Sequence, residues 1–236
     1  MSRILARCHP ALEPLLPPPV PAARALPDWL RTMPAEVAAP TLGGAEVRTL
    51  KHCPPFIDAL GLGVLILLPT DLEVREGEVS WAWDLPAMPD APITRAPVGV
   101  HVPEQATGMP VDLRGQAVLK FTNYWALETE PGWQLLITHP LNREDLPFRT
   151  LSGVVSTARF GLGYIHFPAL WVDPAFSGTL PRGTPIAQLI AIPQPPAGGP
   201  AGLEAHAMSP AEIAASRTLQ ESLQAAPGVY RKSYRG

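Results

Sequence analysis

The sequence predicts a mainly β protein with a barrel or sandwich core, and three observations support this prediction. Proline and glycine, at 31 and 19 residues, together make up 50 of 236 residues, which is too many for a helical bundle. Short apolar or alternating segments recur at near-regular spacing, each bounded by proline or glycine. No helical periodicity separates these segments, which argues against a parallel sheet with crossover helices.

The chain divides by composition into three parts. Residues 1–45 are rich in proline and alanine, and we expect an extended N-terminal arm with at most one helical turn. Residues 46–195 contain the strands, and residues 196–236 contain a linker, one helix and a tail. We interpret the arm as a spacer or as a strap over the core.

The strands follow one another through the central part. Residues 71–75 and 78–83 alternate around Glu76-Gly77, which predicts a β-hairpin with Val79, Trp81 and Trp83 on one face. One long strand is expected over residues 117–129. The other predicted strands cover residues 63–68, 98–102, 133–138, 150–156, 164–172 and 185–192.

One helix is expected after the strands. Ser209, Pro210 and Glu212 have the spacing of a capping box with proline at the first helical position. Pro227-Gly228 is expected to end this helix. Its apolar stripe is thin, which favours packing on the core surface or on another subunit.

Charge and hydropathy exclude several classes of partner. The net charge is −3, the isoelectric point is near 6.1 and charged residues make up 17%, so we expect no nucleic-acid partner. The longest apolar run, residues 59–69, is about half of a membrane span, so no membrane segment is expected. The two cysteines form no disulfide framework and no signal peptide is evident, which predicts a cytoplasmic protein.

Ordered motifs lie in the second half of the β region. The segment EPGW at 130–133 is followed by GVVSTARF at 153–160 and then by PIAQLI at 185–190. In this order they resemble the dUTPase and dCTP deaminase superfamily, over about residues 117–193. The resemblance implies a β-clip fold and a trimer, so we expect a homo-oligomer.

The chain departs from that superfamily where catalysis takes place. The enzymes have an aspartate that activates water and an aromatic residue beneath the deoxyribose, and the matching positions here are Ser156 and Arg159. A hydroxyl with no adjacent base cannot replace a carboxylate as general base. The tail also lacks the glycine-rich motif that closes over the phosphates. We therefore expect neither dUTPase nor dCTP deaminase catalysis.

A longer set of motifs covers about residues 46–193. Its members are KHCPPF at 51–56, KFTNYW at 120–125, PGW at 131–133, THPLNR at 138–143, FRTLSG at 148–153 and HFPALW at 166–171. This set resembles an uncharacterised bacterial and phage family that is known only as a domain of unknown function. The resemblance implies fold and extent but no activity.

Polar side chains gather between residues 133 and 153, at one end of an otherwise apolar sheet. His139 and Arg149 in this segment, with Asn123 and Trp125 on a neighbouring strand, are the predicted ligand contacts. Lys120 ranks below them because alternation places it on the opposite face. The predicted function is binding of a small polar or anionic molecule. A charged surface loop over a structural tryptophan is the alternative interpretation.

Three histidines, His101, His139 and His166, lie in or beside predicted strands. They are candidate ligands for a divalent or transition metal, and a metal-dependent enzyme that uses them is the alternative function. No HxH or HxxxH spacing relates them, so structural histidines are the favoured interpretation and no cofactor is predicted.

Overall fold

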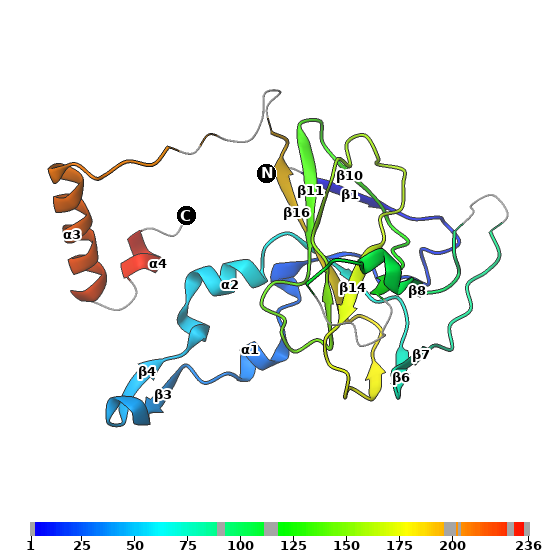
Figure 1. The fold of residues 1–236 in the computed structure, drawn as a ribbon, viewed down its shortest axis with the longest axis horizontal. Helices are drawn as coiled ribbons and strands as arrows, with labels where there is room; N and C mark the ends of the chain where they lie inside the picture. Colours follow the sequence, from blue (N-terminus) through cyan, green and yellow to red (C-terminus); the bar gives the residue numbers. More distant parts are fainter. Residues whose placement is uncertain are drawn as a thin grey trace. The chain divides into compact units, whose positions relative to one another are not determined.

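The computed structural model describes residues 3–88, 93–110, 118–195, 202, 204–225 and 229–233. The chain forms two compact units, which we call the core unit (residues 1–32 and 58–194) and the second unit (residues 33–57 and 195–236). Antiparallel sheets dominate the described chain, and one long helix lies near its C-terminal end (Figure 1). The prediction of a mainly β protein is therefore confirmed.

Two sheets contain most strands of the core unit. The five-stranded sheet has the order β13-β11-β16-β5-β2, and the four-stranded sheet has the order β12-β14-β9-β8. All neighbouring strands in both sheets are antiparallel. The strand bounds are β2 (Val20–Pro21), β5 (Val64–Leu67), β8 (Val98–His101), β9 (Val118–Phe121), β11 (Trp133–Thr138), β12 (Phe148–Thr150), β13 (Gly153–Val155), β14 (Phe167–Trp171) and β16 (Pro185–Pro193).

The main hydrophobic core draws residues from both sheets. In β11, Leu135 and Ile137 are buried while the residues between and beside them are partly exposed, as expected for a strand with one buried face. Phe121 of β9 packs edge-to-face on Phe148 of β12, with ring centroids 4.7 Å apart. The two sheets therefore share one apolar core.

The hairpin at Glu76-Gly77 is confirmed, but it is shorter than predicted. Both turn residues have positive φ, at 51° and 83°, and they join β6 (Leu72–Arg75) to β7 (Glu78–Ser80) in a sheet of order β15-β6-β7, with β15 at Gly178–Leu180. Because β7 ends at Ser80, the predicted shared face is wrong for Trp83, although Val79 and Trp81 line one cavity. Trp83 instead packs edge-to-face on Tyr124, in a second cluster with Leu12 and Leu16.

The first 32 residues are more ordered than the predicted arm. β1 (Ile4–Arg7) pairs with β10 (Ala126–Thr129), and β2 pairs with β5. A short 3-10 helix, η1 (Ala22–Arg24), and α1 (Asp28–Thr32) follow. These pairings are the reason why residues 1–32 belong to the core unit, whereas the sequence places them in a separate arm. The predicted boundary at residue 45 falls inside a strand of the second unit.

The single strand predicted over residues 117–129 is wrong, because β9 ends at Phe121 and β10 begins at Ala126. The Asn123 side chain breaks it: its Nδ2 donates to the carbonyl of Trp125 (2.8 Å), and its Oδ1 accepts from the Trp125 N–H (3.0 Å). These are the backbone groups that a continuous ladder would pair. The predicted alternation of Lys120 against Asn123 and Trp125 therefore does not apply. Residue 117 itself lies outside the described residues.

Gln188 in β16 is a buried polar side chain, with 1% of its surface exposed. Its Oε1 accepts from the Leu141 N–H (2.7 Å), and its Nε2 donates to the carbonyls of Ala59 (3.0 Å) and Leu62. The amide therefore joins β16 to the turn after β11 and to the chain that enters β5. The glutamine of the IAQL motif thus has a structural role in this fold.

The second unit contains a hairpin and the long helix. β3 (Glu36–Ala39) pairs with β4 (Ala45–Arg48), and the boundary with the core unit falls within α2 (Pro54–Leu60). The remaining elements are η2 (Pro40–Leu42), η3 (Leu50–His52), α3 (Pro210–Ala225) and α4 (Val229–Ser233), with η4 (Pro103–Ala106) in the core unit. None of the helices in the described ranges is long and apolar enough to cross a bilayer.

The capping box of α3 is confirmed. The Glu212 N–H donates to Ser209 Oγ (3.3 Å), and the Ser209 N–H donates back to Glu212 Oε2 (2.7 Å). The helix stop that the sequence predicts at Pro227-Gly228 lies outside the described residues.

Candidate functional site

One group of predicted ligand residues stabilises its own turn. Asn123 is 1% exposed, and its amide is bonded to the backbone of Trp125. The Asn123 N–H donates to Nδ1 of His166 (3.3 Å). Burial, and then the charge of Lys120, lower the pKa of His166, which keeps the ring a neutral acceptor. Trp125, half-buried, packs against both hydrophobic clusters.

The other group lies in the loop between β11 and β12. The carbonyl of Arg143 can only accept, so Nε2 of His139 has the proton and donates to it (3.0 Å), while Nδ1 accepts from the Thr150 N–H (3.3 Å). Burial lowers the pKa of His139. Arg149 is exposed and forms an ion pair with Glu144 (3.2 Å). No described hydrogen bond joins this group to Asn123 and Trp125, and none of the five predicted residues lines either cavity described below.

The three-histidine metal site finds no support in the described chain. Both ring nitrogens of His139 are bonded to backbone groups, and Nδ1 of His166 accepts from a backbone N–H. Nδ1 of His101 lies 3.2 Å from Oε1 of Gln105 in its own turn. Among the residues that the structure describes, no three His, Cys, Asp or Glu side chains lie close enough together to hold a metal ion.

An open cavity of about 750 Å³ lies beside the loop that follows β13. We call it the Arg7 cavity. Its lining residues are Arg7, Glu128, Ala158, Arg159, Phe160, Gly161, Leu162 and Gly163. They come from β1, from β10 and from the loop between β13 and β14, so three distant segments of the chain form one site.

The loop at one wall of the Arg7 cavity is a compact turn. The carbonyl of Ser156 accepts from the N–H groups of Arg159 and Phe160 (both 3.1 Å), and the Gly163 N–H donates to the Phe160 carbonyl (2.9 Å). The buried Thr157 hydroxyl lies 2.8 Å from that of Thr129, which itself donates to the Trp133 carbonyl. Thr157 is therefore the donor of the pair, and this bond attaches the loop to β10.

Arg7 joins the other wall to the loop. Its Nη2 bonds to the carboxylate of Glu128 and lies 3.5 Å from the carbonyl of Gly161. A Cβ on Gly161 would lie 2.9 Å from Cγ of Glu128, so the glycine permits this close approach. Nε of Arg7 is buried and has no hydrogen-bond partner in the described structure.

The charges at the Arg7 cavity favour an anion. Arg159 is exposed, and no ion pair joins it to another described residue, while Glu128 is neutralised by Arg7. Phe160 and Leu162, which are 50% and 80% exposed, add an apolar rim. Two guanidinium groups beside an exposed ring fit a ligand with a negative group and a planar or apolar part.

Ser156 does not provide a catalytic base at this loop. Its Oγ accepts a hydrogen bond from Nε2 of Gln194 (2.9 Å). Glu128 is the only carboxylate among the lining residues, and the Arg7 guanidinium occupies it. Activation of water needs a free basic oxygen next to the water. Among the described lining residues, no carboxylate is free of an ion pair.

Sequence reasoning identified Arg159 only as a departure from a motif and did not select Arg7, Glu128 or Phe160. The signal that was available is an arginine-aromatic-glycine run directly after GVVSTA. No protein-family model matches this chain, and neither does any curated protein sequence. The resemblances therefore rest on the motifs alone.

Proposed function

We propose that this chain is a β-clip-like protein, related to the dUTPase and dCTP deaminase superfamily, that binds a small anionic ligand in the Arg7 cavity and does not catalyse the reactions of those enzymes. The placement of the motifs supports the fold part of the proposal. The turn EPGW leads into β11, GVVS contains β13 and IAQL lies in β16, and these strands are neighbours in the order β13-β11-β16. Motifs that lie far apart in the sequence therefore meet in one sheet.

The observation that supports the ligand class most is the guanidinium of Arg159, which no described residue pairs with and which lines the same cavity as the Arg7–Glu128 pair. A charge-assisted hydrogen bond from a guanidinium to a phosphate or carboxylate is stronger than one between neutral groups. A phosphate and a carboxylate would both accept such a hydrogen bond from Arg159, so the proposal covers both kinds of anion.

The test compares Arg159→Ala with Arg24→Ala, an exposed arginine that does not line the cavity. Calorimetric titrations use inorganic phosphate, pyrophosphate and acetate on the full chain. Loss of one charge-assisted bond is expected to weaken the best anion about tenfold in Arg159→Ala. Arg24→Ala should bind like the unchanged protein. Equal affinity in both variants and the unchanged protein would show that the anion site is elsewhere.

The absence of dUTPase catalysis is tested separately. With dUTP or dCTP and magnesium, pyrophosphate release is expected to stay at the level of a protein-free blank, because Ser156 supplies no carboxylate. For the deaminase reaction, no conversion of dCTP to dUTP is expected. Turnover well above the blank in either assay would overturn this part of the proposal.

The homo-oligomer, with three subunits as the resemblance implies, remains part of the proposal. Sheet edges such as those of β12 and β13 are unpaired in the described chain, and a neighbouring subunit is one way to cover such edges. Sedimentation at micromolar concentration tests it, and a monomer would contradict it.

A further inference from the structure

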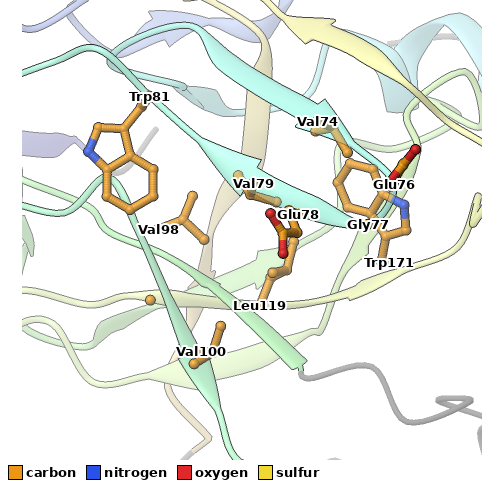
Figure 2. Close-up of a pocket in the computed structure, with 11 residues that line it drawn as sticks. Val74, Glu76, Gly77, Glu78, Val79, Trp81, Val98, Val100, Leu119 and Trp171 are labelled. Carbon is orange, nitrogen blue, oxygen red and sulfur yellow. The ribbon is translucent and has the colours of Figure 1, made fainter.

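A second cavity, of about 600 Å³, lies where two sheets end (Figure 2). We call it the β7–β8 cavity. β7 is the outer strand of the sheet β15-β6-β7, and β8 is the outer strand of the sheet β12-β14-β9-β8. The lining residues are Val74, Glu76, Gly77, Glu78, Val79, Trp81, Val98, Gly99, Val100, Leu119 and Trp171. Its volume is in the range of cavities that bind small organic molecules.

The walls are apolar because strand register places matching faces together. Val74 lies opposite Val79 in the β6–β7 pair, and Val100 lies opposite Leu119 in the β8–β9 pair. Val100 is 60% exposed and Trp81 is 36% exposed, so apolar surface remains in contact with water. Trp171, supported edge-to-face by Phe176 at 5.8 Å, closes the side beside the turn.

The charge of the cavity is negative. Glu76 and Glu78 are its only charged lining residues, and neither forms an ion pair or a hydrogen bond through its carboxylate with another described residue. Arg75 lies opposite Glu78 in the strand register and lines an adjacent pocket with Glu76, Glu78 and Ser177, but no ion pair joins it to either glutamate in the described chain. In Figure 2 the Glu76 carboxylate lies beside the indole of Trp171, and that of Glu78 lies between Val79 and Leu119 in this view.

We propose that the β7–β8 cavity binds a compact apolar molecule that has one positively charged ammonium group. The apolar part would replace water against the valine and leucine side chains. The ammonium group would lie at the two carboxylates and beside the indole of Trp171, where the ring quadrupole attracts a cation. The carboxylates of Glu76 and Glu78 would repel an anion of the same shape. The proposal does not depend on the function of the Arg7 cavity.

The experiment uses three probes that share one apolar part: 3-phenylpropylammonium, 3-phenylpropan-1-ol and 3-phenylpropanoate. Titration calorimetry on the full chain should give the tightest binding for the ammonium and the weakest for the carboxylate. Each carboxylate is expected to contribute about a two- to fivefold preference for the ammonium over the alcohol. In the double variant Glu76→Gln with Glu78→Gln this preference should disappear.

Matched controls separate the charge from the shape of the site. Glu104→Gln removes an exposed glutamate that does not line the cavity, and it should keep the preference. Val100→Trp adds bulk at an exposed lining position and should weaken the binding of all three probes. Val102 is 54% exposed and does not line the cavity, so Val102→Trp should leave the binding of all three unchanged. Equal affinity for the three probes, an unchanged preference in the double variant, or no binding at millimolar concentration would overturn the proposal. Anion binding at the Arg7 cavity should be unchanged in all four variants.

Discussion

Replacement of Gln188 by leucine is predicted to destabilise the core unit by about 2–4 kcal/mol. Leucine has nearly the same size, so the variant removes hydrogen bonds and leaves little empty space. It leaves the Leu141 N–H without its acceptor and the Leu62 carbonyl without its donor, whereas the Ala59 carbonyl keeps the Leu62 N–H (3.3 Å). Each such group costs about 1–3 kcal/mol when it is buried, and less where water can reach it. Leu141 is partly exposed and Leu62 is exposed, so the two groups together should cost about 2–4 kcal/mol, near the lower end of their summed cost.

Urea unfolding monitored by tryptophan fluorescence measures this loss, provided that the dependence on urea is unchanged. Gln134→Leu is the matched control, because Gln134 is partly exposed in the adjacent β11 and has no side-chain hydrogen bond to a described residue. Its effect should stay within about 0.5 kcal/mol. A Gln188→Leu variant that is equally mild would refute the structural role assigned to the motif glutamine.

Gln188→Glu gives a second, pH-dependent readout. It keeps the acceptor for Leu141 but sets an ionised oxygen against two carbonyls, so the buried acid should have a raised pKa in the folded state. Its stability should then increase as the pH falls, since the folded state takes up the proton first. Stability that falls with pH more steeply than in the unchanged protein would contradict this reasoning.

Three further predictions concern other parts of the chain. Burial lowers the pKa of His139 and His166, so the unfolded chain takes up protons first below about pH 6.5. The stability should therefore decrease toward pH 5, with a slope under about 1.4 kcal/mol per pH unit for each half-buried ring. Equal urea midpoints at about pH 7.5 and 5.5 would contradict this prediction. Gly161→Ala should lower the free energy of unfolding by about 1–2 kcal/mol and weaken anion binding, because the added Cβ would collide with Glu128. Gly153→Ala, which has open space around the added Cβ, should change the stability little in the same unfolding assay. Ser209→Ala should lower the stability of α3 by about 1 kcal/mol, measured by far-UV circular dichroism on heating, and Ser216→Ala in the same helix should not.

Features that depend on near neighbours in the sequence were predictable. The capping box needs only Ser209 and Glu212, and the hairpin turn needs only Glu76-Gly77 between two alternating segments. The strand break at Asn123 was not predictable, because the hydrophobic pattern continues through it and only the side-chain geometry shows that the amide takes the place of the ladder.

The candidate site was harder to predict because polar residues close in sequence satisfy one another. Arg143 bonds Asp145 through two nitrogens (2.8 and 2.9 Å), Arg149 pairs with Glu144, and His139 bonds the backbone of its own loop. The predicted cluster therefore has few free groups. The Arg7 cavity depends instead on residues 7, 128 and 159. The pairing of β1 with β10 and the bond between Thr157 and Thr129 bring them together, and this proximity cannot be derived from spacing.

The pairing of β1 with β10 also determines the order in which the site is assembled during synthesis. Arg7 and Glu128 are 121 residues apart, so at about 5–20 residues per second β1 waits roughly 6–24 s for its partner strand to be made. During that time the backbone of Ile4-Leu5-Ala6 has unpaired strand groups, and Arg3 and Arg7 flank it with positive charge. Charges beside an apolar strand discourage pairing with other chains. The arginine that lines the proposed anion cavity in the folded protein is thus also expected to limit mispairing of the nascent chain before that cavity exists.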